Sequence, residues 1–507
     1  MDTVKIGWSR REISTNEPVS IPGQMYIRVS EGIHDPLYVT ALCVDGGEGQ
    51  DKVIFLSCDI VTQFGGVLEP LVTKIHEMRP EIPENAVIWN CTHTHSSVTL
   101  GKTPEKTPDG AAIFPGEQTR EFFLEMASAA VCEAWDNRAE GGIGYGYGYA
   151  VVAHSRRVVY FDEKLKHSKR SFMTPGGKAV MYGNTNDELF SHYEAGADPF
   201  LNLMFTFDKA GKLTGIVVNV PCPSQLSEHF TKLSADYWNE VRQLVAKEYG
   251  EDVYVLPQCA AAGDLSPRIL HYKEAQARRM VLKYGLPYDV QKCTDHAENE
   301  YNKVMAERYD IAERIMDGIR DVYSWAKKDI AFQVPVRHVY TVMALERRKI
   351  TDEEKAWCEE NLELLKAREP DPGAMTPEEY RVALSTYNSA VRRNRAGIER
   401  CEDVKKNPTL DMGAHVVQIG DISFATVRFE LYMDFMHRLQ ARSPFIQTFV
   451  IELAGAEGGT YLATKRAVES KGYSASMFCN MVSADGGQQW VENTLTILKD
   501  MKAQDET

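Results

Sequence analysis

Three consecutive segments decide the fold: residues 52–57 (KVIFLS), 68–78 (LEPLVTKIHEM) and 86–91 (AVIWNC). The first and third are apolar runs with the length of a buried strand, and the segment between them carries apolar residues at helical spacing. A strand, a helix and a second strand in this order indicate a βαβ unit. The chain is therefore predicted to be an α/β protein whose sheet is at least partly parallel.

Strand-like runs continue on both sides of this unit. Residues 201–207 and 213–220 are joined by the polar turn DKAGK, which predicts a hairpin. Residues 141–150 (GGIGYGYGYA) lack a GxGxxG pattern before a helix, so we interpret them as a strand whose small face packs against a neighbour. Further strands are predicted at 37–44, 252–257, 414–419, 422–428 and 445–453, and further helices at 235–248 and 488–501.

The chain changes character between residues 273 and 408. This part is rich in Glu, Lys, Arg and Ala and has helical periodicity at 298–327, 352–367 and 377–405, with one strand predicted at 332–343. We predict that 1–272 and 409–507 form one α/β catalytic domain and that 273–408 is a charged, mainly helical insertion. Such a segment is either a solvated cap or an arm through which copies of the chain form a homo-oligomer.

Composition excludes several classes of protein. Of the 507 residues, 43% are hydrophobic and 25% charged, and the formal net charge of −15 repels phosphate backbones, so no nucleic-acid partner is expected. The first residues contain no secretory signal, and no stretch has the roughly 18 consecutive apolar residues that span a membrane. The ten cysteines are dispersed without a CxxC pair, which predicts a reduced, cytoplasmic protein without disulfides.

The strongest local motif follows the 86–91 strand, where the chain reads Asn90–Cys–Thr–His–Thr–His–Ser96. Side chains two residues apart on an extended segment project to the same face, so His93 and His95 can reach one point. An HxH pair at a strand end is one way to begin a zinc site. Two histidines do not complete such a site, and a pair of hydrogen-bonded histidines in a polar loop is the alternative interpretation.

Several motifs in the same order resemble the neutral/alkaline ceramidases, zinc-dependent amidases that cut the N-acyl bond of ceramide. They are THTHS at 92–96, LSCDI at 56–60, AAGDLSP at 261–267 and the opening IGWSRREIST at 6–15, followed later by Tyr461 in YLAT. The likeness spans about residues 4–268 and 412–500, which is the whole chain except its charged middle. It implies the fold of the ceramidase catalytic domain, with a mixed or parallel sheet at its core.

The resemblance also implies roles for particular residues. His93, Glu430 and Tyr461 are similar to zinc ligands of the family, and His95 resembles the histidine that orients or deprotonates a water. Arg156 and Tyr473 resemble the groups that hold the substrate and stabilise charge on the attacked carbonyl oxygen.

One family feature is missing. A second zinc histidine normally follows the strand equivalent to 216–220, whereas this chain reads Pro–Cys–Pro–Ser–Gln at 221–225. His229 is the best substitute in this loop, and Cys222 and Gln225 are the other donors it offers. A different metal, or none, is the remaining alternative.

Asp59 and Ser266 complete the set of candidates. Asp59 follows a buried run, so it is either a pocket carboxylate at the end of a strand or a cap for the next turn. No GxSxG elbow surrounds Ser266, so we interpret 263–267 as a tight loop that lines the site, with Ser266 in contact with substrate.

Three hypotheses of function follow. The first is a zinc-dependent hydrolase of an amide-type or related bond in a soluble small molecule, because ceramide suits a cytoplasmic, acidic protein without an apolar anchor poorly. The second is a carbohydrate-acting hydrolase without a conventional zinc site that uses carboxylates such as Asp59, Asp264 and Glu430. The third is a non-catalytic binding protein with a degenerate site.

Overall fold

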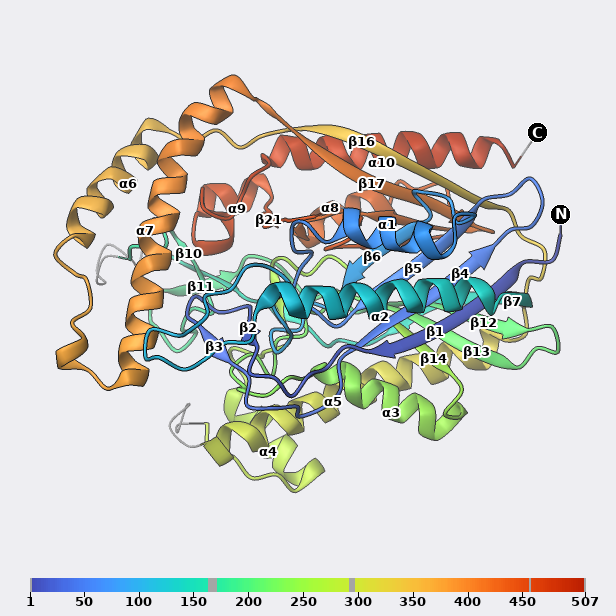
Figure 1. The fold of residues 1–507 in the computed structure, drawn as a ribbon, viewed down its shortest axis with the longest axis horizontal. Coiled ribbons are helices and arrows are strands. Elements are labelled where there is room, and N and C mark those ends of the chain that lie inside the picture. Colours follow the sequence, from blue (N-terminus) through green and yellow to red (C-terminus); the bar gives the residue numbers. More distant parts are fainter. Residues whose placement is uncertain (1, 163–170, 291–296, 456, 506–507) are drawn as a thin grey trace.

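The computed structural model describes residues 2–162, 171–290, 297–455 and 457–505. Its largest element is an eight-stranded mixed sheet (Figure 1). In order across the sheet, the strands are β14 (Tyr254–Cys259), β13 (Leu213–Val220), β12 (Phe200–Asp208), β7 (Ala139–Tyr149), β1 (Lys5–Glu12), β4 (Tyr38–Asp45), β5 (Lys52–Cys58) and β6 (Val87–Cys91). β5 pairs with β6 and β13 with β14 in parallel, while the other neighbours pair antiparallel. The predicted mixed α/β sheet is confirmed.

A second, four-stranded sheet packs on one face of the first. Its strands, in order, are β16 (Val336–Glu346), β17 (Thr409–Ile419), β18 (Ile422–Thr426) and β20 (Gln447–Ile451), and β18 pairs with β20 in parallel. Apolar side chains of both sheets form a shared buried layer, in which Phe424 packs against Phe55 of the large sheet and Phe449 of its own. Alternate residues of each strand face this layer, which is the usual geometry of packed sheets.

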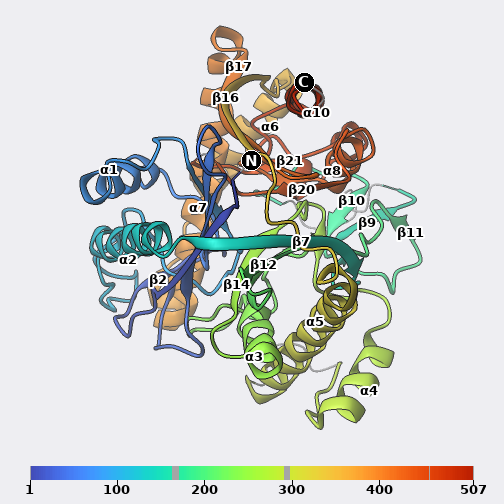
Figure 2. The same ribbon diagram turned by 90° about the vertical axis from the view of Figure 1, so that its right-hand side faces the viewer.

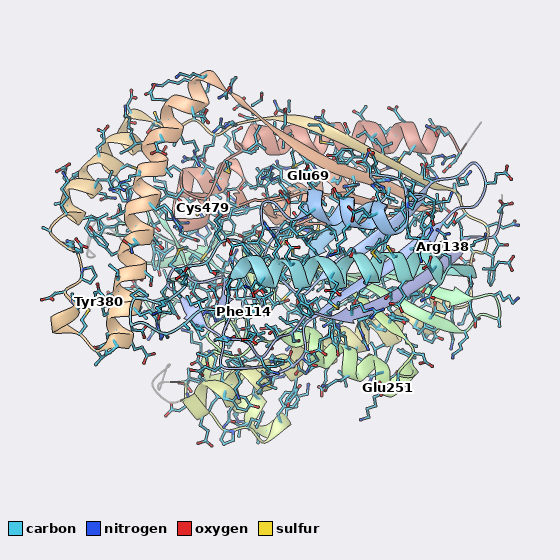
Figure 3. All side chains as sticks on the ribbon, in the orientation of Figure 1. Glu69, Phe114, Arg138, Glu251, Tyr380 and Cys479 are labelled. Carbon is cyan, nitrogen blue, oxygen red and sulfur yellow. The ribbon has the colours of Figure 1, made fainter. Side chains whose placement is uncertain are left out.

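Helices cover the outer faces of both sheets (Figure 2). The large sheet is covered by α1 (Leu68–Met78), α2 (Gly116–Asp136), α3 (Tyr237–Tyr249) and α5 (Ala297–Ala326), and the small sheet by α8 (Met433–Gln440) and α10 (Ala484–Ala503). α2, α8 and the strand β1 were not predicted from the sequence. Side chains fill the space between the layers densely (Figure 3).

The glycine-rich strand β7 explains how α5 reaches the sheet. A Cβ atom at Gly146 would lie 2.1 Å from the Trp325 ring, and one at Gly148 would lie 2.9 Å from Val322. Because both partners belong to α5, the alternating glycines create a shallow groove into which this helix packs. The interpretation of residues 141–150 as a strand with a small packing face is confirmed.

The segment 273–408 is mainly helical, but it does not form a separate body. It contains α4 (Lys273–Tyr284), α5, α6 (Asp352–Leu365) and α7 (Pro377–Lys406). α5 packs on the large sheet, and β16 pairs with β17 along its whole length. α6 and α7 form a helical hairpin at one end of the molecule, and α7 contacts the body there: Ser385 accepts from the backbone of Ile27, and Asn394 donates to that of Phe172 (Figure 1).

The remaining strands are short. They are β2 (Ser20–Ile21), β3 (Arg28–Val29), β8 (His154–Ser155), β9 (Arg157–Tyr160), β10 (Ala179–Met181), β11 (Phe190–Tyr193), β15 (Leu265–Ser266), β19 (Glu430–Leu431) and β21 (Tyr461–Leu462), and α9 spans Lys465–Ser470. The nine described cysteines are buried free thiols, and Cys293 lies outside the described residues. Among the described helices, none has the length and apolar character that crossing a membrane requires.

Candidate functional site

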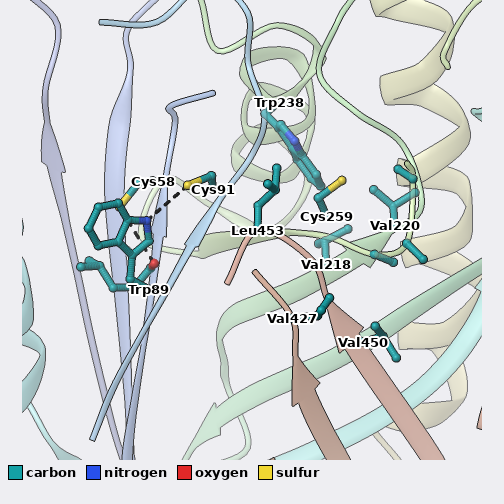
Figure 4. Close-up of a cluster of buried hydrophobic side chains, with 14 of the residues drawn as sticks. Cys58, Trp89, Cys91, Val218, Val220, Trp238, Cys259, Val427, Val450 and Leu453 are labelled. Carbon is teal, nitrogen blue, oxygen red and sulfur yellow. Dashed lines mark hydrogen bonds between the residues drawn. The ribbon is translucent and has the colours of Figure 1, made fainter. Parts of the chain in front are cut away.

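The candidate site lies where the carboxyl ends of the parallel pairs β5/β6, β13/β14 and β18/β20 meet. Chain segments leaving β6, β13, β14, β18 and β20 converge there, and Asn90 at the end of β6 pairs with Ala454 beyond β20. Open α/β sheets bind ligands at this edge because the loops that follow the strands gather there. Buried apolar side chains that include Trp89, Val220 and Leu453 form a dry layer at these strand ends (Figure 4).

Hydrogen bonds hold the backbone and ring Nδ1 of His93, and its Nε2 faces the site. Its backbone has a φ of 62°, a strained left-handed conformation, and its backbone N–H donates to Ile60. Its ring Nδ1 lies 2.5 Å from the carbonyl oxygen of Val61. Since a carbonyl can only accept, Nδ1 carries a proton in either charge state. Nε2 faces the site, where it presents a lone pair when the ring is neutral and an N–H when the ring is protonated.

Glu430 and Tyr461 face His93 from the small-sheet side. The two residues are direct neighbours in the parallel pair β19/β21. The carboxylate oxygen Oε2 of Glu430 lies 3.5 Å from His93 Nε2, and it accepts a hydrogen bond from Arg156 at 3.3 Å. A hydrogen bond also joins the side chains of Tyr461 and Glu430. The structure therefore brings together the three residues that resemble the family's zinc ligands.

His95 is locked in one tautomer by Gln225. The amide oxygen of Gln225 accepts hydrogen bonds from Arg156 (3.2 Å) and Tyr182 (3.3 Å), so its amide N–H group must face His95 Nε2 at 2.8 Å. His95 Nε2 is therefore an acceptor, and the proton sits on Nδ1, which lies 3.5 Å from Glu228. Gln225 fixes the orientation of the second histidine.

The electrostatics of the two histidines differ. Burial alone would lower the pKa of His93, but the carboxylate of Glu430 outweighs burial and raises it above the ordinary histidine value. Burial would raise the pKa of Glu430, but His93 and Arg156 bring it below its usual range. Burial, with His93 and the nearby arginines, pushes the pKa of His95 well below the ordinary value. His95 is thus neutral, whereas the carboxylate of Glu430 is ionised.

Three electron-rich atoms converge as a result. His93 Nε2 lies 3.4 Å from His95 Nε2 and 3.5 Å from Glu430 Oε2, and none of these atoms carries a proton when His93 is neutral. His95 Nε2 is already satisfied by the amide N–H of Gln225, whereas the facing pair of His93 and Glu430 is stabilised by a cation, either a proton on His93 or a metal ion. Two ligands bound about 2.1 Å from a tetrahedral zinc lie about 3.4 Å apart, so the spacing suits that ion.

Among the residues that the structure describes, no group of three or more His, Cys, Asp or Glu side chains is arranged to hold a metal. The set described above is different in kind, because it consists of one imidazole, one carboxylate and one phenol. Tyrosine is an unusual zinc ligand, and burial raises the pKa of Tyr461 well above its ordinary value. An adjacent cation would be needed to ionise it.

The loop that lacks the family histidine places its other donors away from this point. His229 is 39% exposed, with its Nε2 3.7 Å from Glu228. The buried thiol of Cys222 donates to the carbonyl oxygen of Val152, and burial raises its pKa. Of the three candidate substitutes, only Gln225 contacts the cluster, and there it binds His95.

Other predicted residues have structural partners. Asp59 forms a two-pronged ion pair with Arg242 (2.8 and 3.0 Å), which anchors α3 to the end of β5. Ser266 is buried on β15, and its hydroxyl accepts from the backbone of Arg268. Asp264 accepts from the backbone N–H of Met433, and burial raises its pKa to about 6.

Arg156 and Tyr473 both lie beside the cluster. The guanidinium of Arg156 is buried, donates to Glu430 and Gln225, and stands 5.2 Å from the centre of the Tyr461 ring. Tyr473 packs edge-on against Tyr461, and its hydroxyl accepts from Arg393 of α7. Arg393 also donates to Cys479, which is labelled in Figure 3. The helical hairpin therefore reaches the rim of the site.

Sequence reasoning missed Glu452, a buried carboxyl at the end of β20. Glu452 accepts from the backbone N–H groups of Ala262 (3.0 Å) and Leu431 (2.7 Å), and burial raises its pKa to about 8. It ties together the two loops that carry Gly263 and Glu430. The available signal was an acidic residue at the end of the apolar run FVIEL.

Comparison with solved structures identifies the architecture. The crystal structure of neutral ceramidase from Pseudomonas aeruginosa matches with a TM-score of 0.64 and 14% sequence identity, over 99% of this chain and 75% of that one. A structure described as ceramidase complexed with C2 matches with a TM-score of 0.62 and 12% identity, over 99% of this chain and 76% of that one. The fold is neutral-ceramidase-like.

The similarity lies in the structure. No protein-family model matches the chain, and no curated protein sequence does. The ceramidase-like fold confirms the architecture expected from the THTHS, LSCDI and AAGDLSP motifs. At 12–14% identity it does not transfer a reaction, so the chemistry has to be argued from the side chains themselves.

Proposed function

We propose that this protein is a metal-dependent hydrolase that cleaves an amide-type bond in a small molecule. Zinc is the metal we propose, held by His93, Glu430 and Tyr461. The observation that carries the proposal is the approach of His93 Nε2 to the ionised Glu430 at 3.5 Å, within a largely buried cluster. This donor set of one imidazole, one carboxylate and one phenol would leave the fourth position of a tetrahedral zinc for substrate or water.

The residues around these donors have separate tasks in the proposal. When bound, zinc would act as a Lewis acid on the reacting carbonyl or water. His95 is neutral, and the hydrogen bond from Gln225 to its Nε2 fixes its ring beside His93 and Glu430, so we assign it the task of orienting the reacting water. Arg156 keeps Glu430 ionised and oriented, and Tyr473 flanks Tyr461 at the mouth. Hydrolysis then adds one water across the C–N bond and yields a carboxylic acid and an amine.

Two of the three carboxylates suggested for a carbohydrate-acting enzyme are bound by other groups of the protein. Asp59 is paired with Arg242 and Asp264 with the backbone of Met433, so Glu430 stands without them. The alternative of a degenerate binding protein is distinguished by metal content. Protein purified without chelator is expected to contain about one zinc per chain and to release an amine from N-acyl amides; protein with neither property would be a binding protein.

We also propose a reducing, cytoplasmic location and a homo-oligomer formed through the α6–α7 hairpin. The nine described cysteines are buried free thiols, which supports a reducing, cytoplasmic location. The α6–α7 hairpin lies at one end of the molecule, which supports its role as the contact between copies of the chain (Figure 1). Light scattering of the intact chain and of a variant with charge reversals on α6 measures the oligomeric state.

A further inference from the structure

A cavity of about 230 Å³ is bounded on one side by Tyr182 and Arg268, which also contact the partners of His95. α4 and α5 form its other walls, and Glu300, Lys303 and Glu307 line it from one face of α5. These three residues are spaced three and four apart, so they lie on one side of the helix. The cavity is lined by acidic, basic and hydroxyl groups as well as apolar ones.

The cavity shares a wall with the candidate site. The hydroxyl of Tyr182 donates to Gln225, which in turn donates to His95. Arg268 forms an ion pair with Glu228 at 2.5 Å, and the other oxygen of Glu228 lies 3.5 Å from His95 Nδ1. The side chains that fix His95 are thus held by the two residues that face the cavity.

Glu307 is the unusual member of the lining. It is 8% exposed, and its Oε2 atom is buried without a hydrogen-bond partner. The hydroxyl of Tyr288, which lines the same cavity, is also buried and unpartnered. A buried polar atom left unpaired has lost its hydration without compensation, which is unfavourable. A water or a ligand hydroxyl in the cavity would supply the partner that both groups lack.

We propose that this cavity binds a hydroxylated portion of the substrate, such as a polyol or sugar ring, with Glu307 accepting hydrogen bonds from its hydroxyl groups. Tyr288 and Lys303 supply donors to the same portion. This inference rests on the proposed amide hydrolysis and specifies its substrate class as N-acylated, hydroxylated amines. An alkyl chain would leave the carboxylate of Glu307 unpaired, so the lining disfavours it.

The test uses two probes of similar size. N-acetylglucosamine carries ring hydroxyls, and N-cyclohexylacetamide has the same acetamide on a bare ring. We expect the unsubstituted protein to bind the first at least about tenfold more tightly, because a site built around hydroxyl groups rejects an analogue without them. Glu307→Gln removes the charge, keeps one acceptor oxygen and turns the other into an amide donor, so it is expected to weaken the preference, measured by ligand-observed NMR. Glu298→Gln, at an exposed position of the same helix, is the matched control and keeps it.

A second variant protects the test against misfolding. Gln276→Trp fills the cavity from a half-buried position on α4 and is expected to block N-acetylglucosamine while the melting temperature is retained. Equal binding of the two probes by the unsubstituted protein, or an unchanged preference in Glu307→Gln, would show a water-filled cavity and overturn the inference. His93→Ala separates ligand binding in the cavity from the proposed hydrolysis. This variant is expected to keep the preference for N-acetylglucosamine and to lose hydrolysis. Binding preference without any hydrolysis in the unsubstituted protein would overturn the proposed function alone.

Discussion

Two pairs of buried histidines in this molecule have opposite surroundings. The rings of His93 and His95 meet edge-on, with centroids 4.9 Å apart, beside Glu430 and Arg156. The rings of His338 and His415 stack in the small sheet with centroids 5.1 Å apart, and their nitrogens lie 2.9 Å apart.

Burial alone therefore does not make a site. It lowers the pKa of His338 to about 4, and with His338 beside it that of His415 to about 3. At His93 a carboxylate overcomes burial and raises the pKa. The difference teaches that a neighbouring carboxylate turns a packed histidine into a cation-binding one.

The largest effect is expected from removing the ligand histidine. His93→Ala should lose bound zinc, and its rate of amide hydrolysis should fall at least about 100-fold. Removing a residue that merely hydrogen-bonds a metal ligand lowers activity by up to about 100-fold, and removing a ligand itself should cost at least as much. His415→Ala removes an equally buried ring and should keep zinc and turnover. Metal analysis beside an amine-release assay checks both, and zinc retained in His93→Ala would contradict the comparison.

Removing the amide of Gln225 is expected to have the next effect. Gln225→Leu leaves His95 Nε2 and one nitrogen of Arg156 without their partner, so we expect a loss of about 1–3 kcal/mol in stability and about 10–100-fold in turnover. Zinc content should stay unchanged. Gln225→His is the companion variant, because it places the family's imidazole in this loop. Loss of zinc in Gln225→Leu would instead make Gln225 a ligand.

The stacked pair predicts a pH effect on stability with a definite sign. Its folded-state pKa values, about 4 and 3, lie below the unfolded value near 6.5, so the unfolded chain binds more protons. The stability from this pair is complete above pH 6.5 and is lost as pH falls toward 4, by about 1.4 kcal/mol per pH unit for each histidine. His415→Leu should reduce the acid slope by about one proton in urea unfolding. An unchanged slope would show that the pair is solvated.

The smallest effect is expected at His229. Its side chain is 39% exposed and faces Glu228, so His229→Ala should change stability by less than about 0.5 kcal/mol. Zinc content and turnover should stay within about twofold of the unsubstituted protein. A joint loss of metal and activity in this variant would revive His229 as the missing ligand.

Much of the fold could be predicted from local sequence. The predicted helix 68–78 and strand 213–220 match α1 and β13 residue for residue, because their apolar spacing matches the faces they bury. The strand β1 was missed because charged residues occupy its second half, Arg10–Glu12, where the strand is exposed. The role of α5 in the core could not be predicted, because it depends on glycines of β7 far away in sequence.

The site was partly visible in the sequence. The THTHS motif pointed to His93 and His95, and the family resemblance pointed to Glu430 and Tyr461. The partners that fix the cluster, Gln225 to His95 and Arg242 to Asp59, depend on contacts between distant segments. No local pattern distinguishes a carboxylate paired with arginine from one that faces a ligand.

The most direct test of the central claim is anomalous X-ray scattering at the zinc edge from crystals of protein purified without chelator. The account predicts one strong peak between His93, Glu430 and Tyr461, with a matching zinc content of about one per chain. It would be contradicted by crystals without a peak at this cluster, grown from protein that hydrolyses N-acyl amides at an unchanged rate after chelation.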